Sequence, residues 1–269
     1  MRVSGELNGK NIMVTLDVLG EFIKTLDEAE VNKREYLDLI DTTFKNRING
    51  NFSLKPTSFG LLIDKEACYS HVREIVAKAF SYGGFIRIDM EDSPCTDLEI
   101  ELFRKLKAEF PASVGLVLQA YLRRTLQDIK NMKELNREDL PLSFRLCKGI
   151  YVEPEEIAYR NNHDINMHFL EDLEYLLANK IHVGIATHDK SLVEGSYRLL
   201  EKYRVPKNMY EFQMLYGVTP GLRDSIVAQG HSMRIYVPFG KEWFGYSTRR
   251  LKENPKMASH IIKAIFYKG

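Results

Sequence analysis

The sequence predicts a single (β/α)8 barrel of the TIM type that spans residues 1–269 as one domain. Three observations favour this fold class. Eight short β-branched or aliphatic runs recur about every 30 residues, amphipathic helical patterns lie between them, and several runs alternate polar with apolar side chains. A doubly wound open sheet is the alternative, but it usually carries a glycine fingerprint after its first strand, where this chain reads DVLGEF.

The first strand is expected at about residues 11–18, where NIMVTLDV follows only about ten residues of chain. The other strands are expected, in order, at 52–55, 85–91, 114–121, 142–149, 182–188, 210–216 and 233–239. Helical spacing of apolar residues is clear in the connecting segments 95–110 and 164–180. No Pro/Gly/Ser-rich linker interrupts the series, so the composition gives no domain boundary.

The composition excludes several classes of protein. Lys and Arg total 38 against 37 Asp and Glu, so no basic surplus points to nucleic acid. No apolar run approaches the roughly 20 residues of a membrane span, and the N-terminus lacks the apolar core of a signal peptide. Cys68, Cys95 and Cys147 are scattered and form no CxxC, which suits free thiols in the cytoplasm better than disulfides or structural zinc.

Polar and apolar residues alternate within the expected strands, most clearly in FIRIDME at 85–91. In a barrel, this pattern places the apolar face against the helices and the polar face in the lumen. The expected lumen residues are Thr15, Asp17, Ser53, Lys55, Arg87, Asp89, Glu91, Gln119, Tyr121, Arg145, Glu211, Gln213, Arg234 and Tyr236. Buried charges are costly unless they are paired or face a ligand.

Two interpretations of these lumen residues remain open for those deep in the strands. One is internal ion pairing of Arg87 or Arg234 with Asp17 or Glu211. The other is a ligand site, which is favoured at the C-terminal ends of the strands, where barrel enzymes hold their active sites. The polar residues expected at those ends are Lys55, Asp89, Gln119, Lys148, His188 and Tyr236.

Four kinds of chemistry compete for this site. Metal-assisted hydrolysis is disfavoured because no HExxH occurs, and His188 alone is more typical of a hydrogen-bonded interior histidine. Phosphoryl transfer lacks a GxxxxGK[ST] loop. A Schiff-base lyase or aldolase using Lys148 and a redox enzyme using Lys55, Gln119, Arg145 and Lys148 around an electron-accepting ring rank equally on spacing alone. A non-catalytic binding barrel is a weaker fifth interpretation.

Seven segments then decide between these interpretations. FSLK, RIDMEDS, LQAYLRRT, FRLCKGIYVEP, IATHD, YEFQMLYG and IYVPFGKEWFGYSTRRLKENP follow one another strand by strand. Together they resemble the proline dehydrogenase family, from about residue 11 to about residue 265. The short spacing from Tyr236 to the pair Arg249 and Arg250 is similar to that of the monofunctional bacterial branch.

The resemblance implies non-covalent FAD across the C-terminal ends of the strands, and oxidation of L-proline to Δ1-pyrroline-5-carboxylate by hydride transfer from C5 to flavin N5. Asp89 and Arg145 would be the catalytic pair. The expected substrate-binding residues are Lys55, Tyr151, Leu215, Tyr236, Arg249 and Arg250. The expected cofactor-binding residues are Met90, Gln119, Arg145, Lys148, Gly149, Ile150, Thr187, His188 and Gln213.

The adjacent arginines fit a carboxylate clamp. Neighbouring residues of a helix diverge by about 100°, so Arg249 and Arg250 can approach a small carboxylate from different sides with charge-assisted donors. The resemblance also implies a displaced C-terminal helix that closes the site. The helical arm that usually precedes the first strand in the family is expected to be absent or short. Cys147 is expected to be a small buried residue and no nucleophile.

The resemblance further implies a quinone as electron acceptor. Because no hydrophobic anchor is visible in the sequence, we expect a cytoplasmic enzyme with at most a peripheral contact at the inner face of the membrane. L-Proline is the expected substrate, neither a metal nor nucleic acid is expected to bind, and the sequence specifies no oligomeric state.

Overall fold

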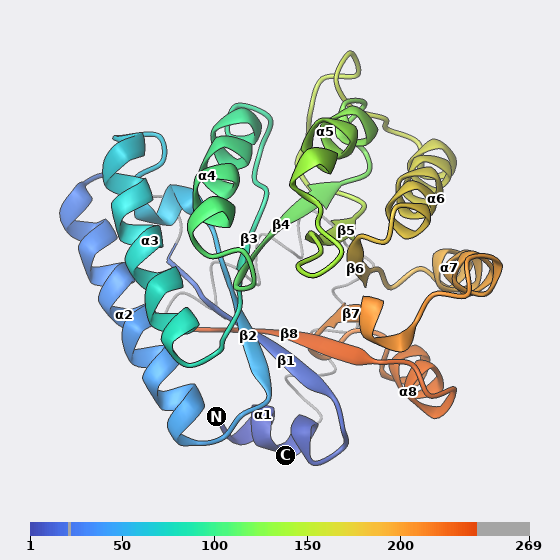
Figure 1. Ribbon diagram of the computed structural model, residues 1–269, viewed down its shortest axis with the longest axis horizontal. Helices are drawn as coiled ribbons and strands as arrows, with labels where there is room; N and C mark the ends of the chain where they lie inside the picture. Colours follow the sequence, from blue (N-terminus) through green and yellow to red (C-terminus); the bar gives the residue numbers. More distant parts are fainter. Residues whose placement is uncertain (21–22, 241–269) are drawn as a thin grey trace.

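A computed structural model describes residues 1–20 and 23–240 of the chain as a closed barrel of parallel strands surrounded by helices (Figure 1). The strands follow one another around the barrel in sequence order. They are β1 (Met13–Val18), β2 (Gly50–Leu54), β3 (Ile86–Ile88), β4 (Val114–Gln119), β5 (Ser143–Cys147), β6 (His182–Ala186), β7 (Tyr210–Leu215) and β8 (Met233–Phe239). β8 pairs in parallel with β1 and closes the ring.

Helices connect consecutive strands and cover the outside of the barrel, and a further short helix precedes β1 (Figure 1). They are α1 (Arg2–Asn8), α2 (Leu26–Lys45), α3 (Lys65–Ser81), α4 (Thr96–Glu109), α5 (Thr125–Met132), α6 (Asn162–Ala178), α7 (Lys190–Lys202) and α8 (Pro220–Ala228). The described residues also form 3-10 turns at η1 (Pro56–Phe59), η2 (Lys133–Leu135) and η3 (Lys207–Met209). The structure therefore confirms the predicted (β/α)8 fold.

The barrel has an apolar outer face and a polar lumen. Side chains such as Phe52, Ile86, Leu116 and Phe144 are fully buried between strands and helices. Burying side chains of this size stabilises a fold by about 1.5–3 kcal/mol each, so this outer layer is the main source of stability. The residues between them in each strand face inward and carry the polar groups.

Side-chain caps fix where several helices begin, and thereby where the loops at the C-terminal ends of the strands finish. Asp64 accepts the Glu66 and Ala67 amides at the start of α3, and Asn161 accepts the Asp164 amide at the start of α6. Such a cap is worth about 1 kcal/mol. Asp189 caps α7 by accepting the Ser191 amide, and it also contacts a predicted site residue described below.

The predicted strands are confirmed, although some are shorter than expected. β3 ends at Ile88, so Asp89 is the first residue past its C-terminal end. The helices expected at 95–110 and 164–180 are α4 and α6. The short helix α1 precedes β1 and buries Leu7. The absence or shortness of the helical arm that is usual in the family stays a prediction. The C-terminal helix that was expected to close the site lies outside the described residues.

Candidate active site

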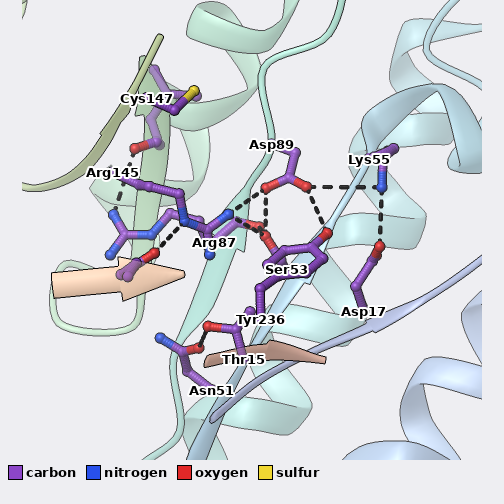
Figure 2. Close-up of polar contacts among 12 residues, drawn as sticks. Thr15, Asp17, Asn51, Ser53, Lys55, Arg87, Asp89, Arg145, Cys147 and Tyr236 are labelled. Carbon is purple, nitrogen blue, oxygen red and sulfur yellow. Dashed lines mark hydrogen bonds and ion pairs between the residues drawn. The ribbon is translucent and has the colours of Figure 1, made fainter. Parts of the chain in front are cut away.

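Polar side chains from five strands, or from the residues that directly follow them, converge at the C-terminal end of the lumen (Figure 2). We call Asp17, Lys55, Asp89, Arg145 and Tyr236 the mouth cluster. They come from β1, the residue after β2, the residue after β3, β5 and β8. The cluster is largely enclosed, because the side chains of Lys55, Asp89 and Arg145 are only 11%, 13% and 7% exposed.

Asp89 lies at the centre of the mouth cluster (Figure 2). Its Oδ1 accepts hydrogen bonds from Arg145 Nη1 at 2.9 Å and from the Ser53 hydroxyl. Its Oδ2 accepts from the Tyr236 hydroxyl at 3.1 Å and lies 3.9 Å from Lys55 Nζ. A carboxylate with this many donors holds each of them in one orientation. The predicted pair of Asp89 and Arg145 is therefore brought into direct contact.

Asp17 is a second carboxylate of the cluster, and the set of site residues expected from the sequence did not include it. Its Oδ2 lies 3.0 Å from Lys55 Nζ, closer than Asp89 does, and its Oδ1 accepts from the hydroxyl of Tyr36 in α2 at 2.9 Å. Burial raises the pKa of Asp17, and nearby Asp89 adds to the rise while Lys55 opposes it. The alternation of polar residues in β1 was the available sequence signal.

Arg145 is oriented by several acceptors. Nε donates to Gln213 Oε1 at 2.6 Å, Nη1 donates to Asp89 and Ser53, and the guanidinium carbon lies 5.3 Å from the centre of the Tyr236 ring. Within residues 1–20 and 23–240, its Nη2 is buried and has no hydrogen-bond partner. A buried charged donor without an acceptor is costly, so this atom is suited to bind an acceptor atom of a ligand.

A second polar group lies deeper in the lumen, and we call Arg87, Ser143, Glu211 and Arg234 the inner cluster. Arg234 donates from Nε and Nη2 to both oxygens of Glu211, at 2.6 and 3.0 Å. Although burial alone would raise it, the charge and hydrogen bonds of Arg234 lower the pKa of Glu211 to about 2. This is one of the internal ion pairs that the sequence left open. Arg87 instead donates to the Ser143 carbonyl and hydroxyl.

The inner and mouth clusters are joined through Gln213. Its Nε2 donates to Glu211 Oε1 at 2.6 Å, while its Oε1 accepts from Arg145. The neighbouring lumen position on β6 is Gly184, where a Cβ would lie 2.4 Å from Gln213 Nε2. The absence of a side chain at Gly184 therefore makes room for the side chain that orients Arg145.

The expected cofactor-binding residues lie around the same end of the barrel, and several already have protein partners. Gln119 Nε2 donates to the Glu91 carbonyl at 2.8 Å, and His188 Nε2 accepts the Leu215 amide at 2.9 Å. Thr187 is buried, and its hydroxyl accepts the Asp189 amide. Backbone donation fixes His188 as an acceptor at Nε2, so its ring is held in one orientation.

Gly149 follows the end of β5 and lies against the ring of Tyr121. Its φ of +106° favours glycine, and a Cβ there would lie 2.1 Å from the ring of Tyr121. The absence of a side chain at Gly149 therefore makes room for the ring of Tyr121. Arg145 Nη2, which has no partner among the described residues, fits a large polar cofactor with hydrogen-bond acceptors, as expected for a flavin.

Lys148 does not have the environment of a Schiff-base nucleophile. Its Nζ lies 2.8 Å from Asp189 Oδ2, and both side chains are about 30% exposed or less. Burial alone would raise the pKa of the Asp189 carboxyl. Hydrogen bonds from Lys148, Ser191 and Asn166 outweigh burial and lower that pKa. A carboxylate at this distance stabilises the charged ammonium, whereas a Schiff base requires the neutral amine.

The remaining predicted residues differ in how deeply their side chains are buried. Met90 is buried, while Tyr151 and Leu215 are half-buried near the strand ends. Ile150 is 43% exposed, so any contact with a cofactor would leave it at the rim. Cys147 is half-buried, which corrects the expectation of a buried residue, because the end of β5 is open to the mouth. Arg249 and Arg250 lie outside the described residues.

Within the part of the chain that the structure describes, no three His, Cys, Asp or Glu side chains are grouped so that they could hold a metal ion. None of the described helices combines the length and apolar character required to cross a membrane.

Comparison with known proteins gives a consistent result. A family model described as proline dehydrogenase matches residues 1–263. The chain is 34% identical to proline dehydrogenase 1 of Bacillus subtilis subsp. natto, over 97% of this chain and 85% of that protein. It is 34% identical to the proline dehydrogenase of Deinococcus radiodurans, over 96% of this chain and 83% of that protein.

Among solved structures, proline utilization A from Bdellovibrio bacteriovorus superposes with a TM-score of 0.86 and 27% sequence identity. The match covers 93% of this chain and 31% of that larger protein. The barrel described above therefore has the same fold as one part of that larger protein.

Proposed function

The chain belongs to the proline dehydrogenase family, and we propose that it oxidises L-proline to Δ1-pyrroline-5-carboxylate with FAD bound non-covalently at the mouth of the barrel. It is an oxidoreductase, and proline oxidation is the first step of proline catabolism. The observation that carries the proposal is the mouth cluster, in which Arg145 is fixed by Asp89 and Gln213 and keeps one buried nitrogen for a ligand.

The residues of the cluster suit a small zwitterion with an apolar ring. Lys55 supplies a cation for the carboxylate, and the ring of Tyr236 supplies an apolar face. The resemblance adds Arg249 and Arg250 as further carboxylate donors, with Tyr151 and Leu215 beside the ring. With substrate bound among these groups, water would be largely excluded, which strengthens each charge–charge contact.

FAD would be held by residues at the ends of β3 to β7. The proposed contacts are Met90, Gln119, Arg145, Lys148, Gly149, Ile150, Thr187, His188 and Gln213. When bound, FAD supplies the acceptor for the hydride that leaves proline C5. Arg145 presents a fixed positive donor where negative charge develops, and it needs no reorganisation because Asp89 and Gln213 already hold it.

The electron acceptor that completes the cycle is proposed to be a quinone. We place the enzyme in the cytoplasm, with at most a peripheral contact at the inner face of the membrane. The competing Schiff-base lyase is disfavoured by the ion pair between Lys148 and Asp189.

The proposed function is tested by the visible absorption spectrum of the purified protein without oxygen, before and after L-proline is added. We expect a flavin spectrum that bleaches with L-proline and stays unchanged with D-proline. A protein that binds no flavin even when FAD is supplied would overturn the cofactor assignment, and a flavin that L-proline leaves oxidised would overturn the substrate.

The carboxylate clamp is tested separately by Arg249→Lys. Lysine cannot reproduce a planar two-point contact with a carboxylate, so we expect the KM for proline to rise about 10- to 100-fold while FAD stays bound. An unchanged KM would remove the clamp assignment.

A further inference from the structure

The mouth cluster contains two carboxylates and two cations, and their contacts divide into two pairs. Arg145 contacts Asp89 at 2.9 Å, whereas Lys55 lies nearer to Asp17, at 3.0 Å, than to Asp89, at 3.9 Å. Asp89 also accepts hydrogen bonds from the Ser53 hydroxyl and the Tyr236 hydroxyl. Among the residues that the structure describes, the nearest counter-ion of Lys55 is therefore Asp17.

Asp17 is itself held from outside the barrel. The hydroxyl of Tyr36 contacts Asp17 Oδ1 at 2.9 Å and the Ser53 carbonyl at 2.7 Å, and it accepts the Val18 amide at 3.2 Å. Tyr36 is 2% exposed and Asp17 is 0% exposed. A side chain of α2 therefore fixes the carboxylate that contacts Lys55.

Burying a charged carboxylate such as that of Asp17 inside a barrel has a large cost in desolvation free energy. Burial raises the pKa of Asp17, and Asp89 adds repulsion, so the charged form depends on Lys55 together with the hydroxyl groups that face it. The groups facing Asp17 are Tyr36 from α2, Lys55 after β2, Asp89 after β3 and Tyr236 from β8. An apolar residue would fill a purely structural position at lower cost.

We propose that Asp17 is a positioning residue that, together with Tyr36, fixes the Lys55 ammonium where it binds the substrate carboxylate. This division leaves Asp89 to orient Arg145 and Tyr236. The inference rests on the proposed function, because it assigns Lys55 to proline binding. It extends the active site outward from the lumen to a helix that covers the barrel.

The test is rapid mixing of the FAD-loaded enzyme with L-proline without oxygen, which gives the Kd for proline and the limiting rate of flavin reduction separately. For Asp17→Asn, which keeps the shape and removes the charge, we expect the Kd to rise about 10- to 100-fold. The limiting rate is expected to change by less than about threefold, since Asp17 acts on binding through Lys55.

Two further variants make the result specific. Tyr36→Phe removes the hydroxyl that contacts Asp17, along with its contacts to the Ser53 carbonyl and the Val18 amide, and we expect a rise in Kd of about 3- to 10-fold. Thr15→Val is the matched control, because Thr15 is a buried lumen residue of the same strand whose hydroxyl contacts Asn51 at 2.6 Å. Its Kd is expected to stay within about twofold of the wild-type value, since its contact does not involve Lys55.

A wild-type Kd in Asp17→Asn, or a rise matched by Thr15→Val, would overturn the proposal. A limiting rate that falls as much as binding weakens would also overturn it, because Asp17 would then act on the reaction itself. If Asp17→Asn does not fold, Tyr36→Phe decides, and an unchanged Kd in that variant refutes the assignment.

Acetylation of Lys55 separates this inference from the proposed function, because it needs neither flavin nor proline. The rate at which acetic anhydride modifies Lys55, measured by mass spectrometry, depends on the fraction of neutral amine. We expect Asp17→Asn to raise this rate at least about threefold and Thr15→Val to leave it unchanged. Equal rates in all three proteins would contradict the anchoring of Lys55 even if proline oxidation is confirmed.

Discussion

The inner cluster and the mouth cluster share one lumen, yet their arginines are held differently. Arg234 in the inner cluster is bound by both oxygens of Glu211, and another of its nitrogens, Nη1, donates to the Val14 carbonyl. Arg145 in the mouth cluster contacts Asp89 through one nitrogen and Gln213 through another, and its Nη2 has no partner among the described residues. Every guanidinium nitrogen of Arg234 therefore has an acceptor in the protein. Arg145 instead has one charged donor that a ligand could use.

This difference indicates how polar residues inside a barrel divide between fold and function. Arg87 is an instructive intermediate, because its Nε also lacks a partner among the described residues, although its other nitrogens donate to Ser143. An unpartnered nitrogen alone therefore does not identify a site. Position toward the C-terminal ends of the strands, together with a converging set of charges, is what distinguishes the mouth cluster.

The largest expected effect on the inner cluster comes from Arg234→Met, which leaves Glu211 buried without its counter-ion. We expect the free energy of unfolding to fall by about 3–5 kcal/mol, measured by denaturant titration. The double variant Arg234→Met with Glu211→Leu removes both charges and is expected to regain most of that loss. If the single variant is as stable as the wild type, the inner cluster does not have the structural role assigned to it.

The same ion pair predicts a dependence of stability on acid. Because the pKa of Glu211 falls from 4.5 to about 2 on folding, its contribution is fully present above about pH 4.5 and is lost as the pH falls toward 2. The lowered pKa corresponds to about 3 kcal/mol. The stability difference between wild type and Glu211→Gln should therefore shrink over this range.

Glu138→Gln is the control for the acid experiment, since the Glu138 side chain is 90% exposed. We expect its difference in unfolding free energy from the wild type to stay within about 0.5 kcal/mol over the same range. A difference for Glu211→Gln that stays constant with pH would show that Glu211 gains no stabilisation from Arg234.

At the mouth cluster, Asp89→Asn keeps the shape of the side chain but removes the counter-ion of Arg145. We expect kcat/KM for proline, per folded molecule, to fall about 10- to 100-fold, and the free energy of unfolding to fall as well, because hydrogen bonds to charged groups are worth about 1.5–3 kcal/mol and Arg145 is left buried without its counter-ion. Steady-state kinetics and thermal unfolding measured on the same preparation check both parts. A large loss of stability without loss of activity per folded molecule would show that Asp89 stabilises the fold and has no part in the reaction.

The smallest expected effect is that of Tyr236→Phe, which removes one hydrogen bond to Asp89 and keeps the ring beside Arg145. We expect kcat/KM to fall about 3- to 10-fold, consistent with roughly 1 kcal/mol for a single hydrogen bond. If Tyr236→Phe instead matches Asp89→Asn, the hydroxyl contacts the substrate directly and does more than orient the carboxylate.

Much of the fold could be predicted from the sequence because short strands and helices leave strong local patterns. The alternation in FIRIDME correctly placed Arg87 and Asp89 in the lumen and Ile86 and Ile88 against the helices. The pairing of Arg234 with Glu211 was one of the options that this alternation left open. The roles of individual residues came largely from the resemblance to a family.

Other features depend on contacts that a strand pattern does not contain. The distance from Lys55 to Asp17 is shorter than that to Asp89, although the strand register pairs Leu54 with Ile88 and Leu16 with Phe52, so it depends on the side-chain conformation of Lys55. Tyr36 reaches Asp17 from a helix, and its position in α2 looks like that of any buried aromatic residue. The accessibility of Cys147 depends on where β5 ends, and strand ends are poorly defined by sequence.

The central claim is that Arg145 acts on the reaction while Arg234 acts on the fold, and Arg145→Met tests it most directly. Rapid mixing with L-proline without oxygen should show a limiting rate of flavin reduction lower by about 10²- to 10³-fold, because a fixed donor to developing charge is lost. The Kd for proline should change by less than about tenfold. Equal losses in rate and binding, or a wild-type rate of reduction, would contradict the account.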